Sequence, residues 1–276
     1  MVGEEVVLLP VEYFSDAEAC SLFWSDRLVY TPLPSSLLWL PPLANQREPR
    51  MYGKFTNLNN QSVIDTAIGG EFGLGRIGPV KNDCEGIQLD VFAAVFTRFN
   101  DQRLLTAADY RVGVPLTYAK GPWSAKLSYE HTSTHLGDEY IERTGRRQAA
   151  HVRDEIVLGL SRYFWNQLRL YGQFGYSFAT SMVVGENRDR YDCGFEWSKL
   201  QDTGIKGQPF AALDIDIRSD QEYYANTTLQ VGWQWKTMRT RNSARLAFEY
   251  YNGYSPYGQF FQDREDWVGV GAFYDW

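Results

Sequence analysis

Residues 123–135 read WSAKLSYEHTSTH, and their side chains alternate between apolar and polar with a period of two. The odd positions from Trp123 to Tyr129 are apolar, whereas the even positions from Ser124 to Glu130 are polar. Successive side chains of a β-strand point to opposite sides of a sheet. The stretch therefore predicts a strand with one apolar face and one polar face.

The same alternation recurs along the chain and predicts about twelve strands. Many of them have ten or more residues, the length that a tilted strand needs to cross a bilayer. Their polar faces contain Gly, Ser and Ala, whereas the outer face of a soluble sandwich would be rich in Lys and Glu. The sequence therefore predicts an all-β fold, a transmembrane antiparallel up-and-down β-barrel. The predicted strands are 50–58, 62–76, 86–99, 105–119, 123–135, 152–164, 167–179, 190–198, 209–218, 222–236, 243–252 and 265–276.

The composition agrees with a barrel in a membrane. Aromatic residues make up 16% of the 276 residues, yet the mean hydropathy is only -0.40, as expected where apolar side chains face lipid and polar ones face a lumen. The net charge of -7 argues against nucleic acid as a partner, because a nucleic-acid binder carries a basic face. No run approaches 18 apolar residues, so no transmembrane helix is predicted. The cysteines are too scattered to indicate disulfides or a zinc site; they are Cys20, Cys84 and Cys193.

The chain ends indicate how the barrel is oriented. The last six residues, GAFYDW (271–276), resemble the C-terminal signal read by the barrel-assembly machinery, so that machinery is an expected partner. This places the C-terminus in the periplasm, and an even number of strands places both ends of the barrel there. The start, MVGEEVVLLPVEYFSD, lacks the basic region and long apolar core of a signal peptide. If the protein is exported, its leader has been removed or lies upstream.

The first 48 residues do not join the strand pattern. Residues 31–50, TPLPSSLLWLPPLANQREPR, are rich in proline and therefore extended, and they end where the first predicted strand begins. We divide the chain into an N-terminal extended segment, 1–48, and a barrel domain, 49–276. The segment either enters the lumen as a plug or leads into the barrel from the periplasm.

Charged side chains on the polar faces predict a largely filled lumen rather than a wide pore. Glu130 also faces inward, where we expect it to pair with Arg153. The aromatic run YYNGYSPYGQFF (250–261) is interpreted as part of a girdle at the membrane interface rather than as a sugar-binding surface. The predicted lumen charges are Asp65, Glu71, Asp90, Arg98, Arg111, Asp214, Asp216, Arg218, Arg245 and Glu249.

A His-x-Ser pair lies on the lipid-facing side of the strand 123–135. Continuing the apolar parity past Tyr129 places His131 and Ser133 on that outward face. Residues two apart on a strand are roughly 6.5–7 Å apart at Cα, a spacing that suits a serine nucleophile and its imidazole base. The outward parity of the next strand reaches Asp154, which could orient the imidazole. The candidate catalytic residues are therefore Ser133, His131 and Asp154, with Asp138 and Glu139 as alternative acids.

Two other interpretations of this region stay open. The polar residues can be purely structural, since His, Ser and Thr are tolerated at barrel rims. Alternatively, a metal ion could be held by histidines and loop acids, because His is the commonest transition-metal ligand. The spacing HTSTH matches the zinc motif HExxH only in its outer histidines. No cofactor is identified, although calcium is possible. The residues of the metal alternative are His131, His135 and His151, together with Asp138 and Glu139.

Two motifs, LLWLPPLANQREPR (37–50) and HTSTHLGDEY (131–140), resemble the domain-of-unknown-function 1207 family of bacterial outer-membrane barrel proteins. The resemblance covers the chain from about residue 31 and implies location and fold, but no activity. The His-x-Ser pair is similar to that of outer membrane phospholipase A and the lipid A 3-O-deacylase, which place such a pair on the exterior wall with an Asn or Glu on a neighbouring strand. Those enzymes have Asn after the serine, whereas this chain has Thr134.

Two functions are therefore expected for a bacterial outer-membrane barrel. The first is a lipid acyl-ester hydrolase of the phospholipase or lipid A deacylase type, whose partner is outer-membrane lipid at the outer leaflet. The second is a non-enzymatic barrel, either a narrow channel or a structural surface protein. The oligomeric state stays open.

Overall fold

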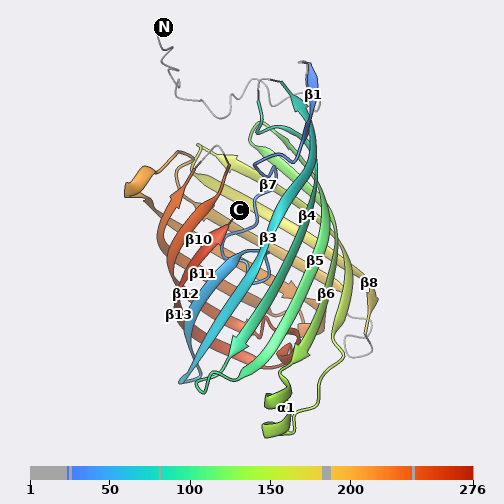
Figure 1. Ribbon diagram of the computed structural model, residues 1–276, viewed down its shortest axis with the longest axis vertical. Coiled ribbons are helices and arrows are strands. Elements are labelled where there is room, and N and C mark those ends of the chain that lie inside the picture. The colour runs from blue at the N-terminus through green and yellow to red at the C-terminus, as the bar shows by residue number, and fades with distance from the viewer. Residues whose placement is uncertain (1–23, 25–26, 81, 182–187, 238–239, 276) are drawn as a thin grey trace.

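The computed structural model describes residues 24, 27–80, 82–181, 188–237 and 240–275, and within them the chain forms a closed antiparallel barrel (Figure 1). The barrel closes because β2 pairs with both β3 and β13, so the twelve predicted strands are confirmed as β2 to β13. The strands are β1 (Leu28–Pro32), β2 (Met51–Leu58), β3 (Gln61–Pro79), β4 (Gly86–Phe99), β5 (Leu105–Lys120), β6 (Trp123–Leu136), β7 (Val152–Phe164), β8 (Leu168–Thr180), β9 (Asp189–Trp197), β10 (Gln208–Arg218), β11 (Ala225–Lys236), β12 (Ser243–Tyr254) and β13 (Arg264–Asp275).

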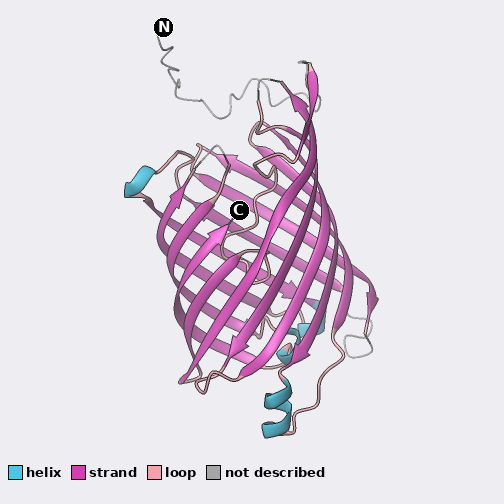
Figure 2. Ribbon diagram, in the orientation of Figure 1, coloured by secondary structure: helices cyan, strands magenta, loops and turns pink. Residues whose placement is uncertain are grey.

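Within the described residues, helix is confined to short segments near the barrel ends (Figure 2). None of the described helices is long and apolar enough to cross a membrane. We name the two ends by the orientation expected from the C-terminal motif. The loop that carries α1 then lies at the extracellular end, and the C-terminus lies at the periplasmic end. The helices are α1 (Asp138–Thr144), η1 (Gly204–Lys206), η2 (Ser219–Gln221) and η3 (Gly258–Phe260).

The strands have an apolar outer face and a polar inner face. On β7, Ile156, Leu158 and Leu160 are exposed on the outside, whereas Arg153 and Glu155 are buried inside. Exposed apolar area costs roughly 25 cal/mol per Å² in water, and soluble monomers rarely expose large apolar patches. The outer wall is therefore built to face hydrocarbon.

Pro115 is accommodated in β5 by a gap in the strand pairing. It pairs with Ser128 of β6, but the β4–β5 ladder passes from Leu89–Leu116 to Phe92–Gly113 without a partner in between. Proline has no N–H to donate to a ladder. The gap falls beside the residue that cannot donate, so the strand continues past it.

The Pro-rich segment enters the lumen as a plug. β1 first pairs with the periplasmic end of β3, and the chain after it runs inside the barrel (Figure 1). The Trp39 ring lies against Gly159, where a Cβ atom would be only 2.8 Å from Trp39 Cη2. The N-terminal segment therefore enters the lumen as a plug and is not merely a lead-in from the periplasm. Its buried residues are Ser36, Leu37, Leu38, Trp39, Pro41, Pro42, Ala44, Asn45, Arg47, Glu48, Pro49 and Arg50.

The extracellular loop 255–263 folds into the lumen from the other end. Tyr257, Phe260 and Phe261 are buried, and the tip of the plug meets the loop where Arg47 Nη1 donates to the Pro256 carbonyl at 3.4 Å. The girdle interpretation of residues 250–261 is therefore wrong for these rings. These three residues lie in a loop, so strand parity does not determine the direction of their side chains.

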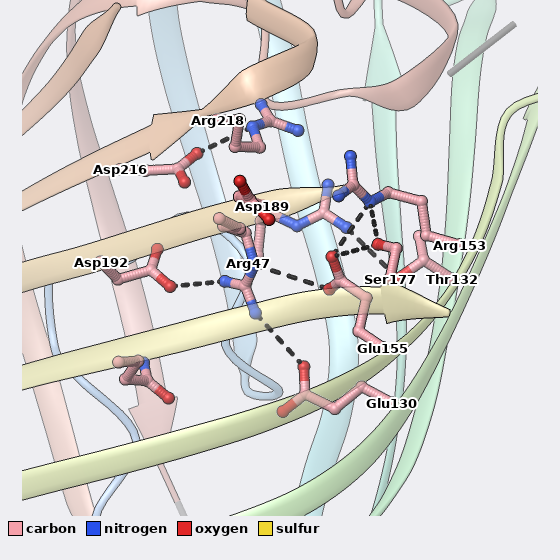
Figure 3. Close-up of polar contacts among 12 residues, drawn as sticks. Arg47, Glu130, Thr132, Arg153, Glu155, Ser177, Asp189, Asp192, Asp216 and Arg218 are labelled. Carbon is pink, nitrogen blue, oxygen red and sulfur yellow. Dashed lines mark hydrogen bonds and ion pairs between the residues drawn. The ribbon is translucent and has the colours of Figure 1, made fainter. Parts of the chain in front are cut away.

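The predicted lumen charges are buried, except for Asp216, which is partly exposed. The predicted ion pair between Glu130 and Arg153 is wrong. Glu130 lies opposite Glu155 in the β6–β7 register, and Arg190 of β9 lies 3.6 Å from the first carboxylate and 3.5 Å from the second. Arg153 instead pairs with Glu155 at 3.0 Å (Figure 3). The lumen is thus a dense network of ion pairs.

Candidate functional site

The strand that carries the His-x-Ser pair keeps one side-chain parity along its whole length. Its ladder with β5 runs in a single register, and so does its ladder with β7. Neither of these two ladders, which lie wholly within the described residues, contains a bulge. His131 and Ser133 therefore lie on the outer wall, while Glu130 and Thr132 are buried inside.

His131 and Asp154 form a hydrogen-bonded pair on this wall. They are direct partners in the β6–β7 register, and His131 Nδ1 lies 2.8 Å from Asp154 Oδ1. The two side chains are 35% and 22% exposed. A carboxylate only accepts hydrogen bonds, so the proton belongs on Nδ1, which leaves Nε2 as the basic nitrogen of a neutral ring.

A second donor holds the same carboxylate oxygen. The Tyr129 hydroxyl donates to Asp154 Oδ1 at 2.7 Å, and the Tyr129 ring lies 6.1 Å from the ring of Phe178 on β8. Phe178 is the extra residue of a β-bulge, because Asp154 pairs with Ala179 and Glu155 pairs with Ser177. Bulges re-aim side chains and are frequent next to active sites. Here the bulge lies directly beside Asp154.

Ser133 lies one outward position beyond His131 towards the extracellular end. Its neighbours across the ladders are Tyr110 of β5 and Val152 of β7. Among the described residues, no hydrogen bond joins Ser133 Oγ to the His131 ring. Hydrogen bonds of catalytic groups are often long without substrate and tighten when substrate binds. The geometry thus supplies an oriented imidazole with a hydroxyl on the same face.

The alternative acids lie away from this pair. Asp138 and Glu139 form the first turn of α1, and Glu139 is paired with Arg143 on the same exposed helix. Of the three acids proposed from the sequence, the one in contact with His131 is Asp154.

The three histidines do not come together. His131 and His135 face outward, and Gln148 Nε2 lies 3.3 Å from His135 Nδ1. His151 is fully buried inside the barrel against Phe261. The reason is parity, since His151 continues the inward-facing odd positions of β7. In the part of the chain that the structure describes, no group of three His, Cys, Asp or Glu side chains could hold a metal ion, so the metal alternative has no geometric basis there.

His151 is nevertheless electrostatically perturbed. Burial lowers its pKa, although the nearby Asp220 carboxylate, 3.7 Å from Nε2, favours the charged ring. Burial alone would raise the pKa of Asp220, but the neighbouring His151 ring and the charges of Arg218 and Arg153 together hold it below its usual range. His151 is thus a buried neutral base outside the lipid-facing site.

Sequence reasoning missed two groups that support the site. Tyr129 shares the outward parity of His131, so its position two residues away was a usable signal for a contact to the same acid. The second group is the plug residue Arg47, whose Nη2 donates to Thr132 Oγ1 at 3.2 Å from inside the barrel. No local pattern indicates that contact, because 85 residues separate its partners.

Comparisons with known proteins place the chain among bacterial outer-membrane barrels. The family model described as a protein of unknown function, DUF1207, matches residues 17–276. No curated protein sequence matches. Closed antiparallel barrels with an apolar outer wall are membrane-spanning structures, and this chain is a β-barrel of the bacterial outer membrane.

Solved structures are similar in fold at low sequence identity. Outer membrane phospholipase A from Escherichia coli superimposes with a TM-score of 0.58 at 12% identity, over 87% of this chain and 97% of that one. The Salmonella typhi outer membrane phospholipase dimer with bound calcium gives 0.52 at 12% identity, over 83% and 93%. The KdgM porin gives 0.47 at 10% identity, over 82% and 99%. At these identities the likeness is one of fold alone.

Proposed function

The chain belongs to the DUF1207 family of proteins of unknown function, and we propose that this member is a lipid acyl-ester hydrolase of the outer leaflet. The observation that carries the proposal is the 2.8 Å hydrogen bond between His131 and Asp154 on the lipid-facing wall, with Ser133 on the same face. Polar groups on a hydrocarbon-facing wall cost free energy. A catalytic role explains why three of them are kept together there.

The proposed reaction is acyl transfer through the serine. Ser133 Oγ attacks the ester carbonyl of a lipid that diffuses to the wall, and His131 Nε2 takes the hydroxyl proton. Asp154 holds the ring and stabilises its charged form. Collapse of the tetrahedral intermediate breaks the ester bond, and His131 returns the proton to the departing alcohol oxygen. Water, deprotonated by His131, then hydrolyses the acyl-serine to release a fatty acid and restore Ser133.

The residue after the serine differs from that of the enzymes with Asn at this position. Thr134 points into the lumen, where its Oγ1 accepts a 2.8 Å hydrogen bond from Gln259 Nε2. The side chain at this position therefore does not reach the outer wall. Calcium could supply positive charge at the oxyanion, although the described residues contain no group of three His, Cys, Asp or Glu side chains that could hold it.

A non-enzymatic structural barrel is the second candidate. It is favoured by the filled lumen and by the lack of a hydrogen bond between Ser133 and His131 among the described residues. The narrow-channel form of this candidate is disfavoured, since the plug and the loop 255–263 meet inside the barrel at Arg47.

The test is fatty-acid release by the purified barrel in detergent micelles, with phospholipid and lipid A as separate substrates, each with calcium or chelator. We expect Ser133→Ala to abolish release from the substrate that wild type hydrolyses. Thr227→Ala is the matched control, because Thr227 is a hydroxyl residue near the extracellular end of β11 on its outward face. Equal release by Ser133→Ala and wild type would show that Ser133 is not the nucleophile and would overturn the proposal. No release by wild type under any condition would leave the structural barrel as the function.

A further inference from the structure

A pocket lies at the periplasmic mouth of the barrel, far along the strands from the His131 pair. Its cavity volume is about 70 Å³, and it is partly open to solvent. The plug forms one side of it through Leu40, Pro41 and Leu43. The strand ends and the periplasmic loops form the other sides. The pocket therefore exists only because the N-terminal segment enters the barrel.

The plug side of the pocket is apolar and firmly held. The Leu43 amide donates to Glu196 Oε1 at 2.6 Å, and the Arg50 guanidinium donates to the carbonyls of Pro42 and Leu43. These bonds fix the backbone that presents the leucines. Leu200 adds a further apolar side chain from the loop after β9. An alkyl chain can pack against this apolar surface.

The acids of the pocket are already neutralised by arginines outside it. Glu196 Oε2 lies 3.3 Å from Arg169 Nη1. Asp275 lies 3.2 Å from Arg50 and 2.9 Å from Arg245. Neither carboxylate therefore needs a cation from a ligand.

The cations of the pocket, in contrast, have no acidic partner within ion-pair distance among the described residues. The Lys236 ammonium donates to Ser198 Oγ at 3.1 Å, and Arg241 Nη1 donates to the Leu37 carbonyl at 3.2 Å. Two further donors, Arg241 Nε and Gln234 Nε2, have no hydrogen-bond partner in the part of the chain that the structure describes, and Gln234 is only 2% exposed. A buried donor without a partner is unfavourable, because it has lost its hydrogen bonds to water. The pocket thus offers spare positive charge and spare donors beside an apolar wall.

From this combination we propose that the pocket binds an amphiphile with one anionic head group, a carboxylate or a phosphate, and an unbranched alkyl tail. The head group lies against Lys236, Arg241 and the Gln234 amide, because these supply the unmatched charge and donors. The tail lies against Leu40 and Leu200. This binding site is separate from the lipid-facing wall and does not depend on the hydrolase proposal.

The test is calorimetric binding of octanoate and octyl phosphate to the full-length barrel held in amphipol, without competing detergent. Octanol carries the tail without the charge, and acetate carries the charge without the tail. We expect both anionic amphiphiles to bind, and octanol and acetate to bind at least about 10-fold more weakly, which corresponds to about 1.4 kcal/mol. Tighter binding of one of the two anions identifies the head group.

Variants locate the ligand. Lys236→Gln and Gln234→Glu are expected to weaken octanoate binding at least about 10-fold, and Leu40→Trp is expected to block it by filling the pocket. Lys199→Gln is the matched control, because Lys199 is exposed on the same loop as Ser198 and does not line the pocket. The gel mobility of the unheated barrel reports that each variant is folded.

The proposal is overturned if wild type does not bind either anionic amphiphile, or if folded Lys236→Gln and Leu40→Trp bind octanoate as wild type does. It is also overturned if octyltrimethylammonium binds as tightly as octanoate. Ser133→Ala is expected to bind octanoate normally, so loss of hydrolysis and loss of this binding are separable.

Discussion

His131 and Asp154 are direct partners in the β6–β7 register, and a 2.8 Å hydrogen bond joins His131 Nδ1 to Asp154 Oδ1 on the outer wall of the barrel. The pair is held by backbone pairing rather than by a flexible loop. Sites on regular strands keep their geometry better than sites on loops. Replacing either side chain should therefore remove its own hydrogen bond without moving its partner, so the contribution of each residue to catalysis can be tested separately.

We expect Asp154→Ala to lower kcat for lipid hydrolysis by about 10²-fold or more, because the imidazole loses the group that orients it as a general base. Tyr129→Phe removes one hydrogen bond to the same carboxylate, so we expect a smaller loss of about 10-fold. Steady-state fatty-acid release measures both. If Asp154→Ala keeps wild-type kcat, the pair has no role in catalysis.

The buried network predicts that Arg190→Met is strongly destabilising. Arg190 lies within ion-pair distance of Glu130, Glu155 and Asp192, and removing one partner of a buried ion pair costs about 3–5 kcal/mol. Arg143→Met is the control, since its pair with Glu139 is exposed and is expected to contribute less than about 1 kcal/mol. Urea unfolding in lipid vesicles measures both variants, and similar losses would contradict the prediction.

Packing of the plug predicts the effect of Gly159→Leu. A side chain at this position would collide with the Trp39 ring, whose Cη2 would be 2.8 Å from the new Cβ. We expect the plug to be displaced, so that residues 34–50 become accessible to a periplasmic protease. Gly172→Leu is the control, because its nearest neighbour would be 3.8 Å away. Protease-resistant plug segments in both variants would argue against the contact.

The buried His151 predicts a loss of stability in mild acid. Burial lowers its pKa in the folded barrel, whereas the unfolded value is about 6.5. The unfolded state therefore binds more protons once the pH falls below about 6.5, and stability decreases by at most about 1.4 kcal/mol per pH unit until the folded pKa is reached. His151→Gln is expected to lose less stability between pH 7.5 and 5. An unchanged pH dependence in this variant would show that other groups dominate.

Side-chain parity allowed much of the fold and part of the site to be predicted from the sequence. Alternation along residues 123–135 was enough to place His131 and Ser133 outward and Glu130 inward, because the direction of a side chain on an uninterrupted strand depends only on its neighbours along the chain. The same local rule located the strands to within a few residues. It also placed Asp154 on the outer wall.

Only the tertiary structure decided how these faces meet. The register sets Asp154 opposite His131, and the nearest cation to Glu130 is Arg111 rather than Arg153. The plug and the loop 255–263 enter the lumen and meet at Arg47. These contacts join residues that are not neighbours in the sequence. No short pattern encodes such contacts. They follow from filling one closed interior with charges that must find partners, since a buried charge without a partner costs several kcal/mol.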